Sequence, residues 1–560
     1  MKDFILLTIA IVVSIACLGQ NKTYYVSISG SDNADGLTPM TPWKTISKVN
    51  TYNFQPGDKI LFKGGDVWHG QLFPKGSGVE GNPITLSSYG VGQPVIDIDE
   101  AEGAGIRLTD QSHWCITNMD ITSGARPKLG IGRQGIVAIS SKQNCSDLQI
   151  TDNKIHDIWG QLGGASEYCG YNSCGVLVKS NRQREASHTE WKDVEISGNN
   201  IYRMDKCGII VLGCKTGMHV HHNTITDTGG DGIYCGGCDY ALIEFNIAKR
   251  TCLRSGYQSI VGDNNWWPHT AAIWISDATG TIMQHNAVYD THRQPGNGDG
   301  EAYDFDFNCI RCIAQFNYSE NNCGLLLIMN KTFENIARYN VSVNDQTHLV
   351  QMQCSNEERN LIYNNVFYID YGTVDLDFFC GNNGEKDKSS LGACFFNNIF
   401  YATGQSFFRT VYTTGAVIGR EFDETTDVPR GQLGKLFFHN CYYGPWKNGL
   451  PNDPEAIIAD PMLESPGTVS NGNLEMSPLK AYQLKEGSTM INAGIRPVDM
   501  GNQDFFGNAL EDGHPDIGIY EKPSSGDIPN INEMREMEQK YRKEFDKALI
   551  KFLEINKKHM

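Results

Sequence analysis

The sequence predicts an all-β fold, a parallel β-helix in which a single chain coils into stacked rungs. Two observations lead to this prediction. An asparagine followed two residues later by an apolar residue recurs along the chain, with spacings of 24 and 23 residues between Asn199, Asn223 and Asn246. A unit of that length has room for three short strands and three turns, which make one rung of such a solenoid.

The recurring asparagines are expected to form a ladder inside the coil. Each amide side chain can bond its own turn and the rung above it. Longer spacings are read as the same unit with an insertion. The predicted ladder consists of Asn153, Asn199, Asn223, Asn246, Asn286, Asn317, Asn340, Asn364, Asn397 and Asn440.

Residues 1–20 have the pattern of an export signal. Lys2 is followed by an apolar stretch over residues 4–15 and then by small residues, as in secretory leaders. The sequence around Cys17 also resembles a lipoprotein cleavage box, so a lipid anchor on Cys17 and simple cleavage after residue 19 or 20 are both open. We expect an exported protein, located in the periplasm, on the outer-membrane surface or in the medium.

Residues 23–65 predict a cap on the first rung. We expect a strand at 23–26, a turn-rich loop at 29–36, a short helix at 41–49 with Pro42 near its start, and an apolar strand after Pro56. Such a helix covers the open end of a solenoid, which otherwise exposes its core.

The predicted β-helix domain covers residues 23–521, and the sequence changes character after it. Residues 522–531 form a linker containing Pro523 and Pro529, and residues 532–560 are charged with a helical pattern. Apolar side chains there recur at three- and four-residue steps and form one stripe. This C-terminal helix is expected to lie along or cap the solenoid, with a partner-binding helix as the alternative. The stripe consists of Met534, Met537, Tyr541, Phe545, Leu549 and Leu553.

Composition limits the partners. The 560 residues carry a formal net charge of −18, which argues against nucleic acid, because phosphate binding needs a basic surface. After residue 20 no apolar run is long enough to span a membrane. We expect a monomer without nucleic-acid or membrane partners, apart from the lipid anchor considered for Cys17.

Cysteine is abundant, with 17 residues, and export would permit disulfides. The pairs Cys235/Cys238 and Cys309/Cys312 have zinc-ligand spacing, but 70 residues separate them. Cys235, like Cys207, also falls at a repeat position expected to be small and buried. Stacked core cysteines are therefore favoured over a zinc site, and a local Cys169–Cys174 disulfide is expected.

The most informative stretch is 298–308, where Asp304 and Asp306 alternate with Tyr303, Phe305 and Phe307. In a strand, this pattern places both carboxylates on one face and the aromatic side chains on the other. Buried unpaired carboxylates are costly, so we expect the aromatic residues to face the core and the acids to face outward.

Aligning successive rungs on the ladder asparagines places other side chains beside these acids. One inward position holds Ile209, Ile233, Ile273, Tyr303, Leu325 and Leu349. The next position, outward, holds Ile210, Tyr234, Trp274, Asp304, Leu326 and Val350. The second outward position holds Leu212, Gly236, Ser276, Asp306, Ile328 and Met352.

In this register Tyr234 and Trp274 stack on successive rungs beside Asp304. Aromatic rings next to carboxylates suit a sugar-binding subsite, since the rings offer flat apolar surface and the acids bind hydroxyl groups. The alternative is that both rings only pack beneath neighbouring insertions.

Asp304 and Asp306 are the first candidates for a catalytic carboxylate pair. Residues two apart on a strand are about 6.6–7 Å apart along it, which is compatible with either glycosidase geometry. Repulsion between close acids raises one pKa and divides the acid and base roles. Glu301, Asp299 or Asp231 could supply the second carboxylate instead. The alternative is a solvated strand face or a calcium site.

Insertions between rungs are expected to form one wall of a groove, because functional residues concentrate in such loops. The candidate insertions are residues 160–172, 258–269 and 291–300. His269, His292 and Arg293 lie in two of them and could bind substrate, or act as the base of a lyase.

The opening at 23–65, the asparagine rungs and the ending at 504–521 together resemble the secreted right-handed parallel β-helix proteins of the pectate-lyase-like superfamily. The resemblance covers roughly residues 23–521. It implies the right-handed fold, and it leaves the reaction open, because the superfamily contains polysaccharide lyases, glycoside hydrolases and non-enzymes. Its calcium-dependent lyases use clustered Asp ligands and a Lys or Arg base, whereas no Lys or Arg is expected on the strands next to Asp304.

The favoured function is an exported glycoside hydrolase that cleaves a polysaccharide without a cofactor, because the outward face is rich in carboxylates and poor in cations. The first alternative is a calcium-dependent polysaccharide lyase in which Glu301, Asp304 and Asp306 hold the metal. The second alternative is a glycan-binding or adhesive solenoid without catalysis.

Overall fold

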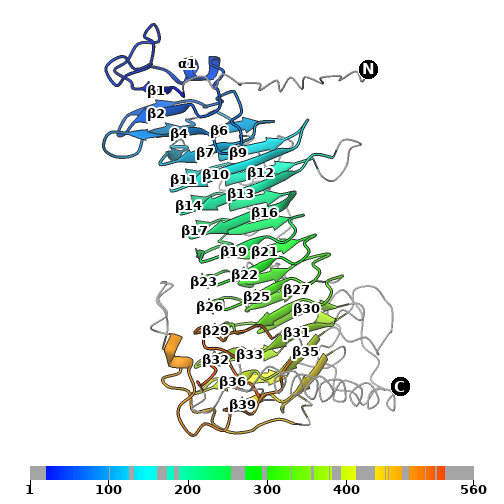
Figure 1. Ribbon diagram of the computed structural model, residues 1–560. Coiled ribbons are helices and arrows are strands. Elements are labelled where there is room, and N and C mark those ends of the chain that lie inside the picture. Colours follow the sequence, from blue (N-terminus) through cyan, green and yellow to red (C-terminus); the bar gives the residue numbers. More distant parts are fainter. Residues whose placement is uncertain are drawn as a thin grey trace, which may run out of the picture.

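The chain coils into a long parallel β-helix in the computed structural model (Figure 1). The predicted all-β solenoid is thereby confirmed. The structure describes residues 21–99, 101–124, 131–160, 173–181, 188–253, 271–292, 299–329, 331–354, 359–376, 379–380, 393–410, 435–447, 449–451, 453, 455–468, 479–497, 500–510 and 514–523.

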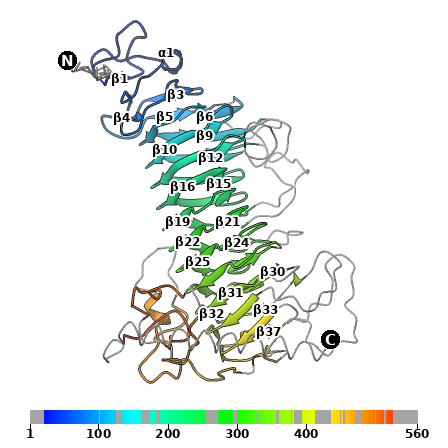
Figure 2. The same cartoon turned by 45° about the vertical axis from the view of Figure 1, so that its right-hand side comes forward.

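Three long sheets run along the solenoid, and every strand pair in them is parallel (Figure 2). The 14-stranded sheet contains β1 (Thr23–Val26), β2 (Lys59–Lys63), β4 (Ile84–Tyr89), β7 (Trp114–Thr117), β10 (Cys145–Thr151), β13 (Trp191–Ser197), β16 (Cys214–His221), β19 (Leu242–Glu244), β22 (Ile282–Gln284), β25 (Ile313–Gln315), β28 (Ile336–Arg338), β31 (Asn360–Tyr363), β35 (Ala393–Phe396) and β38 (Lys435–Phe438).

The other sheets follow the same order of rungs. The 13-stranded sheet contains β3 (Val67–His69), β5 (Val95–Asp97), β8 (Asp120–Thr122), β11 (Lys154–Ile158), β14 (Asn200–Met204), β17 (Thr224–Thr228), β20 (Ile247–Lys249), β23 (Ala287–Tyr289), β26 (Tyr318–Glu320), β29 (Val341–Val343), β32 (Val366–Ile369), β36 (Ile399–Ala402) and β39 (Cys441–Tyr443). The 10-stranded sheet contains β6 (Gly103–Thr109), β9 (Arg133–Ser140), β12 (Cys174–Ser180), β15 (Cys207–Leu212), β18 (Ile233–Gly236), β21 (Ile273–Ser276), β24 (Tyr303–Phe305), β27 (Leu326–Ile328), β30 (Val350–Cys354) and β34 (Phe379–Cys380). A two-stranded sheet pairs β33 (Thr373–Leu376) with β37 (Phe407–Thr410).

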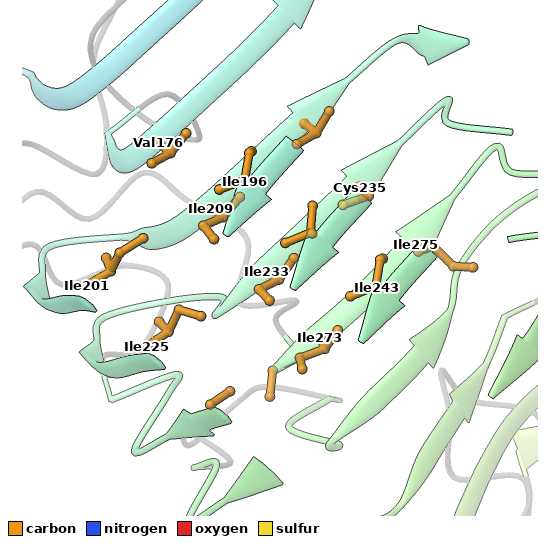
Figure 3. Packing of buried hydrophobic residues seen from close by; sticks show 14 of the residues in the cluster. Val176, Ile196, Ile201, Ile209, Ile225, Ile233, Cys235, Ile243, Ile273 and Ile275 are labelled. Atoms are coloured by element: carbon orange, nitrogen blue, oxygen red, sulfur yellow. The ribbon is translucent and has the colours of Figure 1, made fainter. Parts of the chain in front are cut away.

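Apolar side chains of the same position stack from rung to rung inside the coil. Ile209, Ile233 and Ile273 pair in successive rungs and are fully buried (Figure 3). Because β-branched residues pack well on a pleated surface, this repetition gives one continuous core instead of separate domains. The 10-stranded sheet contributes one face of that core, and its other face carries the candidate site.

The asparagine ladder forms, with a correction at its C-terminal end. The Asn199 amide donates to Asn223 Oδ1 at 2.9 Å, and the Asn223 amide donates to Asn246 Oδ1 at 3.0 Å. The observed ladder is Asn153, Asn199, Asn223, Asn246, Asn286, Asn317, Asn340, Asn365, Asn398 and Asn440.

Asn364 and Asn397 were predicted as ladder members, but the ladder uses the residue after each of them. Both occupy the left-handed backbone conformation, with φ of 51° and 54°, which Asn tolerates better than most residues. Their amides instead hold the C-terminal segment, through the carbonyl groups of Gly518 and Ile495. Two adjacent asparagines in each of these rungs made the choice ambiguous from sequence.

The N-terminal cap is confirmed, although its helix is shorter than expected. Helix α1 spans Ile46–Thr51 instead of 41–49, because Thr45 caps it by accepting a hydrogen bond from the Lys48 N–H. Trp43 lies before the helix in extended backbone that bridges to Val26, and its ring stacks on Tyr24 in the core.

After β39 the chain returns along the outside of the solenoid. This C-terminal segment, which includes the 3₁₀ turn η3 (Lys480–Tyr482), packs a second apolar cluster against the last rungs (Figure 1). Met490, Phe505 and Ile517 are among its buried residues. The linker beyond Pro523 and the predicted helix at 532–560 lie outside the described residues, as do residues 1–20 with Cys17.

Within the part of the chain that the structure describes, no helix has the length and apolarity needed to cross a membrane.

The cysteines behave as core residues. Cys207, Cys235, Cys238, Cys309 and Cys312 are fully buried, which agrees with the core interpretation. Cys174 is also buried, and Cys169 lies outside the described residues, so the Cys169–Cys174 disulfide stays a prediction.

Candidate active site

On the outer face of the 10-stranded sheet, the side chains change from apolar to aromatic and then to acidic along one column of paired residues. Val137, Leu177 and Ile210 pair in successive rungs of this column and form a buried apolar cluster. Tyr234 follows Ile210, then Trp274 pairs with Tyr234, and Asp304 with Trp274. The predicted register is therefore confirmed up to Asp304.

Beyond Asp304 the predicted register is wrong by one residue. Tyr303 pairs with Leu326 instead of Leu325, so Leu327 and Gln351 continue the outward column in place of Leu326 and Val350. Three consecutive leucines, 325–327, fit either register by hydrophobicity alone. A one-residue shift exchanges the two faces of a strand, and the pairing places Leu326 and Val350 in the core.

The strand that carries the acids ends earlier than expected. Tyr303 and Phe305 lie in the core, as predicted, and Asp304 points to the opposite face. Phe307 does not face the core: it is 40% exposed, because β24 ends at Phe305 and the chain turns at Asn308, where φ is 60°. Asp306 therefore sits at the end of the strand, and its N–H donates to the Ile275 carbonyl.

Five carboxyl groups gather around this point, and they form what we call the acidic cluster: Asp231, Asp299, Glu301, Asp304 and Asp306. Asp231 and Glu301 are completely buried, Asp304 is 5% exposed and Asp299 is 7% exposed, whereas Asp306 is half-buried. The interpretation of Asp304 as part of a solvated strand face is thus wrong. Because burying carboxyl groups is costly, packing alone does not explain this enclosed group of acids, and a functional role is indicated.

Burial raises the pKa of Asp304 well above its usual range, and the negative charges of Asp306, Asp299, Glu301 and Asp231 raise it further. Asp304 Oδ1 is buried and accepts no hydrogen bond from the described residues. The raised pKa favours the protonated form of Asp304, which suits a carboxylic acid that is to donate a proton.

Asp231 has a different environment, because the Lys206 ammonium lies 3.9 Å from Asp231 Oδ2 and is itself 2% exposed. The Cys207 thiol donates to the same oxygen at 3.1 Å. Burial leaves the pKa of Asp231 raised, although Lys206, Cys207 and the nearby Trp274 indole favour its charged form. Among the described residues, Asp231 thus has a cation, Lys206, beside it.

Glu301 lies two rungs beyond Asp231, and Gly324 provides the space for it. A Cβ atom on Gly324 would lie 2.4 Å from the His348 carbonyl oxygen and 3.3 Å from Glu301 Cγ. A larger residue would collide with the His348 backbone and crowd the glutamate. The enclosed position of Glu301 favours a role in shaping the site over direct contact with substrate.

Tyr234 and Trp274 stack ring to ring, with centroids 3.6 Å apart and planes 9° from parallel. Trp274 is only 6% exposed, so the expected open platform of two aromatic rings is not found. The Tyr234 hydroxyl lies 3.0 Å from Ser276 Oγ. Trp274 Nε1 is buried and has no hydrogen-bond partner of normal geometry among the described residues.

The remaining predicted site residues stay outside the described cluster. His292 is described, with an exposed side chain and its N–H donating to the Thr251 carbonyl. His269, Arg293 and most of the three predicted insertions lie outside the described residues. Their roles in substrate binding remain predictions, as does the groove.

The proposed calcium ligands Glu301, Asp304 and Asp306 do not form a metal-binding group. In the described part of the chain, no three His, Cys, Asp or Glu side chains are arranged to hold a metal ion. The buried position of Glu301 agrees with this geometry.

Lys206 is the functional candidate that sequence reasoning missed. It pairs with Gly230 in the next rung, and its backbone carbonyl accepts a hydrogen bond from the Gly230 N–H. The sequence feature that could have identified Lys206 was its position opposite a Gly–Gly dipeptide in aligned rungs, since two glycines leave room for a long side chain.

Known proteins resemble this chain more clearly in fold than in sequence. No protein-family model matches the chain. A lacto-N-biosidase from Bifidobacterium longum subsp. longum is 25% identical over 609 aligned positions, which cover 89% of this chain and 36% of that protein. The chain therefore spans about a third of the length of this curated relative.

Two crystal structures of a lacto-N-biosidase of family GH136 from Eubacterium ramulus, the native protein and its selenomethionine derivative, share the fold. Each superposes with a TM-score of 0.53 and 19% sequence identity, covering 70% of this chain and 68% of the other. Three stacked parallel sheets, an internal asparagine ladder and this likeness lead to one conclusion. The chain has the parallel β-helix fold that these structures share.

Proposed function

We propose that the protein is a glycoside hydrolase whose acidic cluster cleaves an oligosaccharide or polysaccharide. The observation that carries this proposal is the contrast within the cluster between Asp304, which is buried and has a raised pKa, and Asp306, which is half-buried at the end of the same strand. Glycosidases need one carboxylic acid to protonate the leaving oxygen and one carboxylate on the other side of the bond.

The accessible carboxyl groups take the catalytic roles. Asp306, the most exposed, acts as the carboxylate that attacks or activates water. The proton donor comes from Asp304 or Asp299, which are 5% and 7% exposed. Asp231 and Glu301 are fully enclosed and act by shaping the charge around these three residues.

Hydrolysis is favoured over the lyase alternative by the charges beside Asp304. A lyase must neutralise a uronate, which calls for a cation next to the base. The neighbouring strands, Ile273–Ser276 and Leu326–Ile328, contain no lysine or arginine. All charged neighbours that shift the Asp304 pKa most strongly are carboxylates.

The relatives supply the first substrates to try. Both are named lacto-N-biosidase, so glycosides of lacto-N-biose belong at the head of a panel that also includes neutral and acidic polysaccharides. Export, proposed from residues 1–20, would bring the enzyme to such glycans outside the cytoplasm.

The experiment is release of new reducing ends by the wild-type chain and by the variants Asp299→Asn, Asp304→Asn and Asp306→Asn. Asp306→Asn and one of the other two should lose nearly all activity while remaining folded. Asp193→Asn is the matched control, because Asp193 is exposed and has a φ of 54°, a conformation that Asn adopts equally well.

A glycan-binding solenoid without catalysis gives the opposite pattern. Glycan binding without any product from the full panel, together with unchanged binding in Asp306→Asn, would reject the hydrolase and support the binding protein.

A further inference from the structure

We propose that Lys206 is a positioning residue of the acidic cluster, which holds the buried Asp231 carboxylate in an ion pair and so sets the charge beside Asp304. This inference rests on the proposed hydrolase function, in which Asp304 is a proton donor or lies beside it. Lys206 touches neither substrate nor the reacting atoms, so it acts through Asp231.

The geometry shields Lys206 from water and places its ammonium group beside Asp231. Its side chain is 2% exposed, and its ammonium lies 3.9 Å from Asp231 Oδ2. A buried ammonium without a counter-charge is strongly unfavourable. The pair with Asp231, which is 0% exposed, supplies that counter-charge.

The backbone is built to admit this side chain. A Cβ atom on Gly230 would lie 2.5 Å from Lys206 Nζ and 2.6 Å from its Cδ, so Gly230 leaves the space that the lysine fills. The Gly230 N–H donates to the Lys206 carbonyl, and the Thr228 hydroxyl donates to the Gly230 carbonyl. The first hydrogen bond joins the Lys206 backbone to Gly230, and the second holds Gly230 in place.

The groups facing Lys206 explain its charge. Burial lowers the pKa of Lys206, but Asp231, Cys207 and Cys252 together outweigh burial and leave the pKa raised. Its chain neighbour Asp205 is also fully buried. Lys206 thus remains a cation, in contrast to isolated buried lysines, which tend to lose their proton.

The consequence reaches Asp304 through the charge of Asp231. Asp231 is among the carboxylates that raise the pKa of Asp304, with Asp306, Asp299 and Glu301. If Asp231 became neutral, Asp304 would lose one repulsive neighbour and would release its proton at a lower pH. Lys206 prevents this by favouring the charged form of Asp231.

The test compares the pH dependence of kcat/KM in the wild type, Lys206→Met, Lys206→Arg and the double variant Lys206→Met/Asp231→Asn. In Lys206→Met, Asp231 takes up a proton, and the alkaline limb should move to lower pH by roughly one unit. The double variant should show the same limb as Lys206→Met, because Asp231 is uncharged in both. Lys206→Arg keeps the cation and should show less than half the shift.

A second readout keeps the inference testable if no glycan is hydrolysed or if the methionine variant folds poorly. The pH dependence of the unfolding midpoint reports the protons retained by the folded cluster without activity. It should flatten in Asp231→Asn, steepen in Lys206→Met because folded Asp231 then retains a proton of its own, and stay close to the wild type in Lys206→Arg. Lys154→Met is the control for a lost lysine ion pair, because Lys154 pairs with Asp120 at 2.7 Å on the 13-stranded sheet.

A purely structural lysine gives a different result. It would lower kcat or stability in Lys206→Met while leaving the alkaline limb and the pH slope of unfolding unchanged, and that outcome would overturn the inference. Failure of hydrolysis together with a steeper pH slope in Lys206→Met would reject the proposed function and retain the role of Lys206.

Discussion

Two buried polar arrays run through this solenoid, and they are built in opposite ways. In the asparagine ladder every amide has partners: Asn223 donates to the Ile196 carbonyl and to Asn246, and its Oδ1 accepts from the Asn199 N–H. In the acidic cluster, Asp231 Oδ1 and Asp304 Oδ1 are buried and lack hydrogen-bond partners of normal geometry among the described residues.

The difference separates stability from function. A fully satisfied polar network specifies one register of the coil and stabilises it. Unsatisfied buried acids destabilise the fold, so their presence indicates a site where strain serves a reaction. Two kinds of buried polar group in one molecule can therefore be told apart by whether their hydrogen bonds are complete.

The largest expected effect is the loss of activity when an accessible acid is neutralised. Asp306→Asn should lower kcat/KM by about 10²–10⁴-fold, since acid–base and nucleophilic groups contribute on this scale. The unfolding midpoint should stay equal or rise, because one of several repelling charges is removed. If activity and stability fell together in this variant, Asp306 would instead have a structural role.

The ladder should show the reverse pattern. Asn223→Ala leaves the Asn199 N–H and the Ile196 carbonyl without partners in the core, and should lower the free energy of unfolding by about 2–4 kcal/mol. Urea denaturation measures this change, and activity per folded molecule should be retained. Asn200→Ala, at the exposed neighbouring position, should change stability by less than about 0.5 kcal/mol.

A smaller effect, the pH dependence of the free energy of unfolding, distinguishes the acidic cluster from the asparagine ladder. The pKa of Asp304 is raised in the folded state, so above about pH 4, the unfolded value, the folded chain retains a proton that the unfolded chain has lost. Stability should therefore fall as pH rises toward the folded pKa, with a slope approaching about 1.4 kcal/mol per pH unit from this group.

Asp304→Asn removes that slope. Urea unfolding of the wild type and the variant across the pH range measures the difference, which should grow with pH. A slope that is identical in both proteins would contradict the raised pKa.

The smallest effect concerns the aromatic pair. Tyr234→Phe removes the hydrogen bond to Ser276 but keeps the stack on Trp274, so it should lower stability by about 0.5–1.5 kcal/mol. KM should stay within about twofold, because Trp274 is enclosed. A large rise in KM, measured on the same oligosaccharide, would restore the interpretation of Tyr234 as a substrate platform.

The repeats predicted the solenoid, the ladder and the column that joins Tyr234, Trp274 and Asp304, because each depends on a periodic pattern. The predictions from sequence were wrong where two neighbouring residues were chemically alike. Asn364 and Asn365 were exchangeable in the pattern, and so were Leu325 and Leu326, although their pairing differs by one position.

The burial of the acidic cluster could not be predicted from the sequence either. The alternation at 303–306 showed that Asp304 faces away from the core but could not show that this face is enclosed. Nor could it show that Lys206, two rungs before Trp274 in the sheet, reaches Asp231. Burial and cross-rung contacts depend on how separate rungs are covered, and local periodicity does not contain that information.

The central claim, that the acidic cluster hydrolyses a glycosidic bond, is tested most directly by following the oxygen of water. The full chain would be incubated with lacto-N-biose glycosides and the wider glycan panel in water enriched in ¹⁸O. We predict one ¹⁸O atom at each new reducing end, detected by mass spectrometry, and no product from Asp306→Asn. An unlabelled, unsaturated sugar would identify a lyase, and labelled product from Asp306→Asn at the wild-type rate would place the chemistry outside this cluster.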